Sequence, residues 1–129
     1  MKDIFQSVVT VLMSAAVFLF GGFSGLFIAL VVFIAVDYIS GFAAAVIRRQ
    51  LSSEVGAKGI AKKIVMLLIV ATGHILDLYV VKTGDMVRDL ATVFYIANEG
   101  ISILENCGAL GLPVPKKIAD ILAQLKKGQ

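Results

Sequence analysis

The fold of this chain is decided by residues 4–36, which read IFQSVVTVLMSAAVFLFGGFSGLFIALVVFIAV and carry no charge. A single membrane crossing needs about 20 predominantly apolar residues, so these 33 residues exceed one span. Gly21, Gly22 and Gly25 interrupt the stretch near its middle, and clustered glycines favour a turn. We therefore predict a helical hairpin. A single long, kinked helix is the alternative, because membrane helices tolerate glycine.

The composition of the whole chain is also that of a membrane protein. Of its 129 residues, 59% are hydrophobic and 16% are charged, whereas a soluble domain is about 25% charged. There are too few charges to cover a soluble fold of this size. The length allows one domain, residues 1–129. A cleaved signal peptide is disfavoured, because the apolar stretch runs far beyond the small residues at 14–16.

Four helices and a short tail are predicted along the chain. Residues 48–63 carry five basic side chains among serines and glycines, and we expect them to form a loop. After residue 111, apolar side chains recur at the spacing of an amphipathic helix that is too short to span a membrane. The predicted class is all-α: a polytopic membrane protein with three or four transmembrane helices, at about residues 4–20, 26–47, 64–81 and 86–106, and a short C-terminal amphipathic helix in the tail 112–129.

The distribution of basic residues predicts the orientation of these helices. Cytoplasmic loops of membrane proteins carry an excess of Lys and Arg. Of the twelve such residues in the chain, five lie in the segment 48–63 and four in the tail 112–129. Four spans with both termini in the cytoplasm satisfy the rule at every loop. If residues 86–106 instead lay along the membrane surface, the four tail lysines would be left outside.

Three polar residues interrupt the apolar helices. A charge at the bilayer centre costs about 2.5–3.5 kcal/mol on insertion scales, so Asp37 should face a neighbouring helix or a water path. His74 and Asp77 share a helix face at a spacing of three residues. A polar contact between helices, or a position near the membrane surface for Asp77, is favoured for this pair over a proton relay.

A polar stripe runs along residues 86–106. Its members recur at spacings of four and three residues, and two further polar residues, Asn98 and Glu105, broaden it. Such a stripe fits a transmembrane helix that faces water or other helices, whereas an amphipathic helix on the membrane surface is the alternative. The stripe consists of Arg88, Thr92, Tyr95, Glu99, Ser102 and Asn106. With Asp37, His74, Asp77 and Asn98, these residues are the candidate pore-lining or helix–helix polar contacts.

Motifs of enzymes and metal sites are absent or incomplete. Asp37, Ser40 and Gly41 partly match membrane enzymes that transfer phospho-alcohols from a CDP carrier, but the further acids that hold metal ions in those enzymes are missing. No phosphate-binding loop or nucleotide fingerprint occurs. The single cysteine, Cys107, excludes an intrachain disulfide. We predict no catalytic residue, no metal, no cofactor and no nucleic-acid partner.

Two groups of motifs carry a resemblance to a known family. The first is Asn98-Glu99-Gly100-Ile101-Ser102-Ile103-Leu104-Glu105-Asn106, followed by Gly111-Leu112-Pro113-Val114-Pro115-Lys116-Lys117. The second is Asp37-Tyr38-Ile39-Ser40-Gly41, followed by Gly59, Ile60, Lys62 and Lys63. In this order and with these gaps, they resemble the toxin-secretion and phage-lysis holin family. The resemblance covers residues 37–117, whereas the first 36 residues match only in being apolar.

The resemblance implies a function that the residues alone do not name. Holins are non-enzymatic, multi-pass proteins of the bacterial inner membrane that form homo-oligomers. They assemble into timed lesions that release a cell-wall-degrading endolysin, or in some relatives a toxin, and they need not bind the endolysin directly. The implied partners of this chain are membrane lipid and further copies of itself. The alternatives are a small ion channel and a membrane scaffold that binds a partner through its basic tail.

Overall fold

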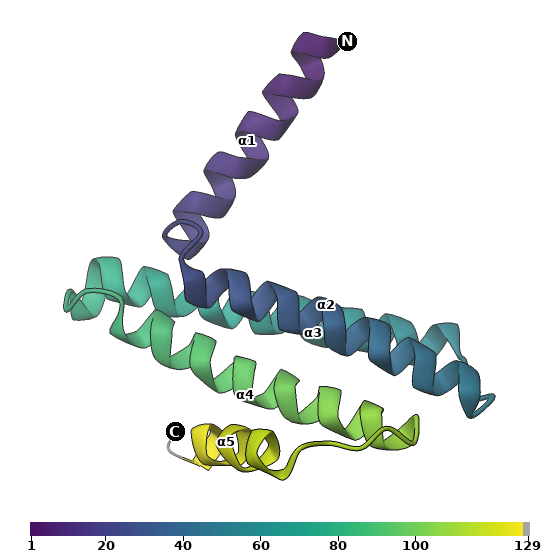
Figure 1. Ribbon diagram of the computed structural model, residues 1–129. Coiled ribbons are helices and arrows are strands. Elements are labelled where there is room, and N and C mark those ends of the chain that lie inside the picture. The colour runs from purple at the N-terminus through teal and green to yellow at the C-terminus, as the bar shows by residue number, and fades with distance from the viewer. Residues whose placement is uncertain (128–129) are drawn as a thin grey trace.

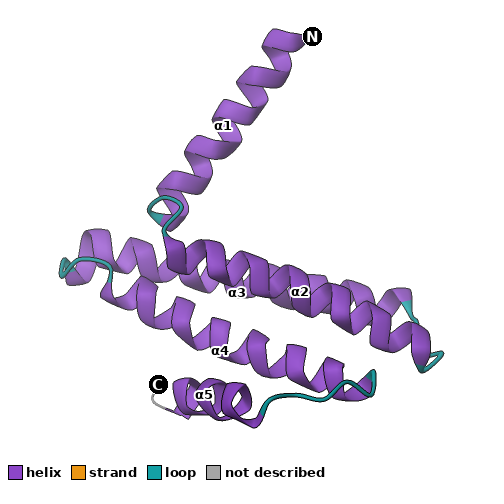
Figure 2. Ribbon diagram, in the orientation of Figure 1, coloured by secondary structure: helices purple, strands orange, loops and turns teal. Residues whose placement is uncertain are grey.

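Residues 1–127, the part of the chain that the computed structural model describes, form helices and connecting turns without a strand (Figures 1 and 2). The predicted all-α class is therefore confirmed. The last two residues of the predicted tail, 128 and 129, lie outside the described residues. The helices are α1 (Lys2–Phe20), α2 (Gly25–Ile47), α3 (Ser53–Leu76), the π-helix η1 (Asp77–Val81) that continues α3, α4 (Met86–Ala109) and α5 (Lys116–Lys127).

The glycine-rich segment separates α1 from α2, so one continuous helix is not formed. Gly21 and Gly22 adopt φ angles of 76° and 106°, and residues other than glycine rarely adopt such positive angles. Ser24 then begins α2, because its Oγ accepts a hydrogen bond of 3.2 Å from the backbone N–H of Phe27. However, α1 projects away from α2 and buries none of its side chains (Figure 1). The turn is as expected, but the two helices do not pack as a hairpin.

The basic segment 48–63 differs most from the prediction. Its last eleven residues are helical, because α3 begins at Ser53 and only residues 48–52 connect it to α2. Ser52 caps the helix by accepting a 3.4 Å hydrogen bond at Oγ from the backbone N–H of Val55, and Glu54 places a negative charge in the first turn. These capping signals outweigh the turn preference of the glycines in the segment. The predicted loop is therefore wrong over residues 53–63.

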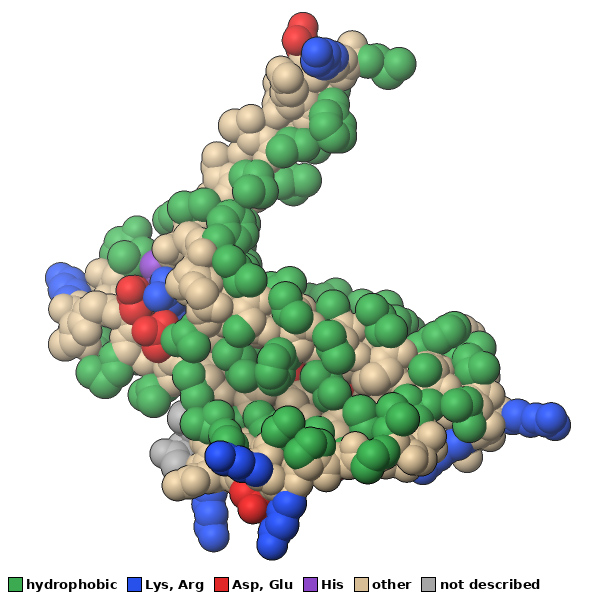
Figure 3. All heavy atoms as spheres, in the orientation of Figure 1, with side chains coloured by type: hydrophobic (Ala, Val, Ile, Leu, Met, Phe, Trp, Pro, Cys, Tyr) green, Lys and Arg blue, Asp and Glu red, His purple; other side chains and the backbone are tan. Residues whose placement is uncertain are grey.

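A bundle of α2, α3 and α4 forms the body of the molecule, and α5 folds back beneath α4 (Figure 1). Leu30, Val70 and Ala97, one from each of these three helices, are fully buried and mark the core. Exposed hydrophobic side chains are spread over the whole length of the bundle on the face in Figure 3. Three segments are long and apolar enough to cross a membrane, namely α1, α2 and the continuous helix Ser53–Val81. Helix α4 is not among them.

Candidate functional site

Three charged side chains from three helices meet inside the bundle. The Lys63 ammonium on α3 lies 2.6 Å from Oδ2 of Asp37 on α2 and 2.8 Å from Oε2 of Glu99 on α4. The three side chains are only 4–15% exposed. Two carboxylates share one ammonium, so Asp37, Lys63 and Glu99, here called the charged triad, have a formal charge of −1. The triad joins all three helices of the bundle at one level.

An amide extends this network along α4. The Asn106 side chain donates from Nδ2 to two oxygens of Asp37, the carboxylate Oδ1 at 3.0 Å and the backbone oxygen at 3.1 Å. The same Nδ2 lies 2.9 Å from Oγ of Ser40. Ser40 in turn donates to the backbone oxygen of Asp37. A Cβ at Gly41 would make an ordinary van der Waals contact with the Asn106 amide, at 3.4 Å. Asp37 is thus held from one side by Lys63 and from the other by Asn106.

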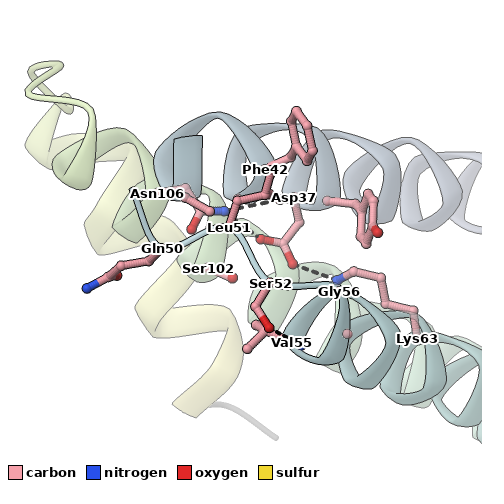
Figure 4. A pocket seen from close by; sticks show the side chains of 14 residues that line it. Asp37, Phe42, Gln50, Leu51, Ser52, Val55, Gly56, Lys63, Ser102 and Asn106 are labelled. Atoms are coloured by element: carbon pink, nitrogen blue, oxygen red, sulfur yellow. Dashed lines mark hydrogen bonds and ion pairs between the residues drawn. The ribbon is translucent and has the colours of Figure 1, made fainter. Parts of the chain in front are cut away.

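A cavity of about 310 Å³ opens beside the charged triad, between α2, α4 and the beginning of α3. Figure 4 shows Asp37 between Asn106 and Lys63 in this cavity. Its polar side also includes Ser102, while Phe42 and Leu51 contribute apolar wall. The polar groups of the triad therefore adjoin a space that is not filled by protein.

A second polar group lies at one end of the bundle, beside the turn between η1 and α4. Asp77 is 3% exposed, and its two carboxylate oxygens accept hydrogen bonds from the backbone N–H groups of Val87 and Arg88, at 3.0 and 2.8 Å. These N–H groups belong to the first turn of α4, which has no earlier helical partners for them. Asp77, the first residue of η1, therefore caps α4 and forms an interhelical polar contact. Among the described residues, Asp77 forms no hydrogen bond with His74.

Arg88 connects this end of the bundle to α1. Its Nη1 donates to the backbone oxygen of Phe20, the last residue of α1, at 3.2 Å. Asp85 and Asp89 flank the same guanidinium at 3.2 and 3.1 Å. A Cβ at Gly21 would lie 2.6 Å from both Arg88 Nη1 and His74 Cε1. The end of α1 is thus fixed to α3 and α4. We call this the hinge contact, and it is formed by Phe20 and Gly21 with His74 and Arg88.

His74 is buried in the hinge contact, with 6% of its surface exposed. Its Nδ1 has no hydrogen-bond partner among the described residues. A buried polar atom without a partner is costly, and most such atoms in folded proteins are satisfied. The hinge contact is therefore less completely bonded than the charged triad.

The polar stripe of α4 faces inward in the single chain. Arg88, Thr92 and Glu99 are buried, and the Thr92 hydroxyl donates to the backbone oxygen of Arg88 at 2.7 Å. Tyr95 and Asn98 are half-buried. The structure thus gathers most of the predicted residues into two polar groups, one at the charged triad and one at the hinge contact. In this arrangement the stripe contacts α2 and α3 of its own chain.

Lys63 is the residue of the candidate site that sequence reasoning misses. The composition of segment 48–63 predicts a basic loop, but the structure places Lys63 inside the bundle as the partner of both acids. A signal was available, because Asp37 and Glu99 both require a cation and Lys63 immediately precedes the apolar run of the third helix. Within residues 1–127, no group of three or more His, Cys, Asp or Glu side chains is arranged to hold a metal ion.

Comparison with known proteins places these features in a family. The family model of the bacteriophage holin family matches residues 14–127. An uncharacterized 14.9 kDa protein in the nagH 3′ region of Clostridium perfringens is 42% identical over 107 residues, which cover 83% of this chain and 81% of the relative. The uncharacterized protein Lmo0128 of Listeria monocytogenes is 46% identical over 81% of this chain and 74% of its own length. YtkC of Bacillus subtilis, also uncharacterized, is 36% identical over 93% and 89%. No solved structure gives a significant match.

Proposed function

The chain belongs to the bacteriophage holin family, and from that membership we propose that it assembles with copies of itself into timed lesions of the bacterial inner membrane. The lesions release endolysin for host lysis without a required direct contact between the two proteins. Both termini lie in the cytoplasm, and this topology requires α4 to cross the membrane with the bundle as a fourth span. Three helices of spanning length and an apolar exterior support the membrane location on which this function depends.

One observation carries the proposal: charged groups are held inside a bundle whose exterior is apolar. In lipid, an isolated charge is expensive, so Asp37, Lys63 and Glu99 are satisfied either by one another or by water. The single chain uses the first solution. With both carboxyls ionised, the triad would keep one uncompensated negative charge, which hydration would stabilise. An oligomer around water is therefore a second low-energy arrangement of the same side chains.

In the assembled lesion, we expect the polar face of α4 to turn from its own bundle toward the lumen or a neighbouring protomer. Arg88, Glu99 and Asn106 would exchange their contacts within the chain for water or for groups of another copy. Such a transition requires two arrangements of similar free energy. A competition between the closed bundle and the oligomer would provide the delay before lysis.

The test is expression in a bacterium together with a cytoplasmic endolysin, while optical density and membrane potential are followed. We expect normal growth, then an abrupt loss of potential and lysis. Without the endolysin, the potential should still collapse but the cells should remain intact. A slow, ion-specific leak would indicate a channel, and unchanged potential would indicate a scaffold; either result would overturn the proposal.

A matched pair of variants connects the lysis assay to the structure. Glu99→Leu combined with Ser102→Leu removes two members of the polar stripe from α4. Ile101→Leu combined with Leu104→Ile alters two apolar residues of the same helix and serves as control. Lysis time and lesion size should change in the first variant and stay near wild type in the second. Unchanged timing in the first variant would remove the polar face of α4 from the mechanism.

A further inference from the structure

Helix α5 has an apolar face that is wider than its contact with the bundle. Leu122 is buried and points at Gly100 of α4. On the same side of α5, Ile118, Ile121 and Leu125 remain 48%, 48% and 40% exposed. The contact with α4 thus covers only one edge of the face. The exposed part of the apolar face, at Ile118, Ile121 and Leu125, would be stabilised by contact with lipid or with another protein surface.

The opposite side of α5 is strongly basic. Four lysines and one acid, Asp120, give the helix a net charge of +3. All five charged side chains are exposed, and in Figure 3 blue side chains project from the part of the surface where α5 lies. An amphipathic helix with lysines beside an apolar face fits an anionic membrane surface. The lysines are Lys116, Lys117, Lys126 and Lys127.

Leu122 fixes the position of α5 along the bundle. Gly100, which seats Leu122, directly follows Glu99, and Glu99 pairs with Lys63 of α3. On α3, Lys63 is the last Asp, Glu, Lys or Arg before Asp77, so the apolar run begins immediately after it. Leu122 therefore seats α5 beside the level of the charged triad, where α3 changes from its basic first half to its apolar second half.

We propose that α5 binds the surface of a bilayer that contains anionic phospholipid. Ile118, Ile121 and Leu125 enter the boundary of the acyl chains, and the lysines contact the headgroup phosphates, while Leu122 stays on Gly100. Lipid binding by α5 requires only the membrane location of the chain. Its failure would therefore be distinguishable from a failure of lesion formation.

The experiment uses the absence of tryptophan from the chain. Ile121→Trp places one fluorophore on the open apolar face of the full-length protein, and Gln124→Trp places one on the polar side as a matched control. Each protein is reconstituted into vesicles of phosphatidylcholine alone or of an equal mixture with phosphatidylglycerol. Quenching by brominated acyl chains measures contact with lipid, and quenching by acrylamide measures contact with water.

We expect Ile121→Trp in the mixed vesicles to be quenched by the brominated chains and protected from acrylamide, and Gln124→Trp to show the reverse. Changing the four lysines to glutamine should weaken the lipid quenching of Ile121→Trp, as should high salt. Leu125→Trp provides a second position on the same face in case Ile121→Trp disturbs folding, and it should behave alike.

Three results would overturn the proposal. Equal lipid quenching in both kinds of vesicle, unaffected by the lysine changes, would mean apolar insertion without selection for anionic lipid. Free access of acrylamide to both Ile121→Trp and Leu125→Trp would mean that the face stays in water. Protection from both quenchers would mean that protein, such as a second copy of the chain, covers it.

Discussion

Lys63 of α3 and Glu99 of α4 form an ion pair of 2.8 Å although 36 residues separate them in the sequence. The same ammonium lies 2.6 Å from Asp37 of α2. One cation therefore joins three helices. Without it, two carboxylates from different helices would face each other at the same site.

The first prediction concerns this cation. Lys63→Met leaves two neighbouring acids unpaired, and loss of one partner from a buried ion pair costs about 3–5 kcal/mol. Because the Lys63 side chain is 15% exposed, we expect the free energy of unfolding to fall by an amount near the lower end of this range. Denaturant unfolding in detergent, followed by circular dichroism, measures the loss. If the closed bundle delays lysis, this variant should also lyse cells earlier.

Lys62→Met is the matched control, because Lys62 is the adjacent lysine and is exposed. Its effect should stay within about 0.5 kcal/mol. The triple variant Asp37→Asn, Lys63→Met, Glu99→Gln removes all three charges and should recover part of the stability lost in Lys63→Met. Equal stability of Lys63→Met and Lys62→Met would contradict the role assigned to the charged triad.

Much of the fold could be predicted because it depends on local properties of the chain. The uncharged residues 4–36 indicate membrane helices by length, and the glycines at 21 and 22 indicate where the chain turns. The spacing of apolar residues after Pro115 indicates the amphipathic helix α5. Each of these signals lies within a single segment and requires no knowledge of its neighbours.

The charged triad could not be predicted in the same way, because Asp37 lies 26 residues before Lys63 in the sequence and Glu99 lies 36 residues after it. Composition assigned Lys63 to a basic loop, whereas the Ser52 cap starts a helix that carries it into the bundle. The projection of α1 was missed for a related reason. An apolar helix indicates burial in lipid or protein, but its sequence does not specify which of the two surrounds it.

The second prediction concerns the link between α4 and α2. Asn106→Ala removes the donor that contacts both the side chain and the backbone of Asp37. Hydrogen bonds to charged groups contribute about 1.5–3 kcal/mol, and we expect a loss of this size in the same unfolding assay. Asn98→Ala, at a half-buried position of the same helix, should cost less. A larger loss for Asn98→Ala would refute the assignment of this link to Asn106.

The third prediction tests the hinge contact. Gly21→Ala combines backbone strain at φ 76° with clashes against Arg88 and His74. Gly22→Ala has strain at φ 106° but no atom within 4 Å of the added Cβ, so it measures strain alone, of order 1–3 kcal/mol. We expect Gly21→Ala to be the more destabilising variant and to make the turn more sensitive to limited proteolysis. Equal behaviour of the two variants would show that the close approach of Arg88 and His74 is unimportant.

The fourth prediction concerns the seat of α5 on α4. A Cβ at Gly100 would lie 2.8 and 2.9 Å from the Leu122 methyl carbons and 3.2 Å from Phe33 of α2, so Gly100→Ala should displace α5. Gly108 is in the same helix and has no atom within 4 Å of an added Cβ. Since alanine favours a helix interior over glycine by about 1 kcal/mol, Gly108→Ala should leave the chain equally stable or stabilise it. The two substitutions are chemically identical, and only Gly100→Ala should release α5.

Trypsin cleavage after Lys116 and Lys117 measures this release, because both lysines lie at the beginning of α5. Cleavage should be faster in Gly100→Ala than in wild type and unchanged in Gly108→Ala. Leu122→Ala removes the side chain that the new methyl group meets, so adding Gly100→Ala to Leu122→Ala should change cleavage much less than adding it to wild type. Undiminished sensitivity to Gly100→Ala in the Leu122→Ala background would mean that α5 is not held through Leu122. The methyl group would then act through Phe33 and the packing of α4 on α2.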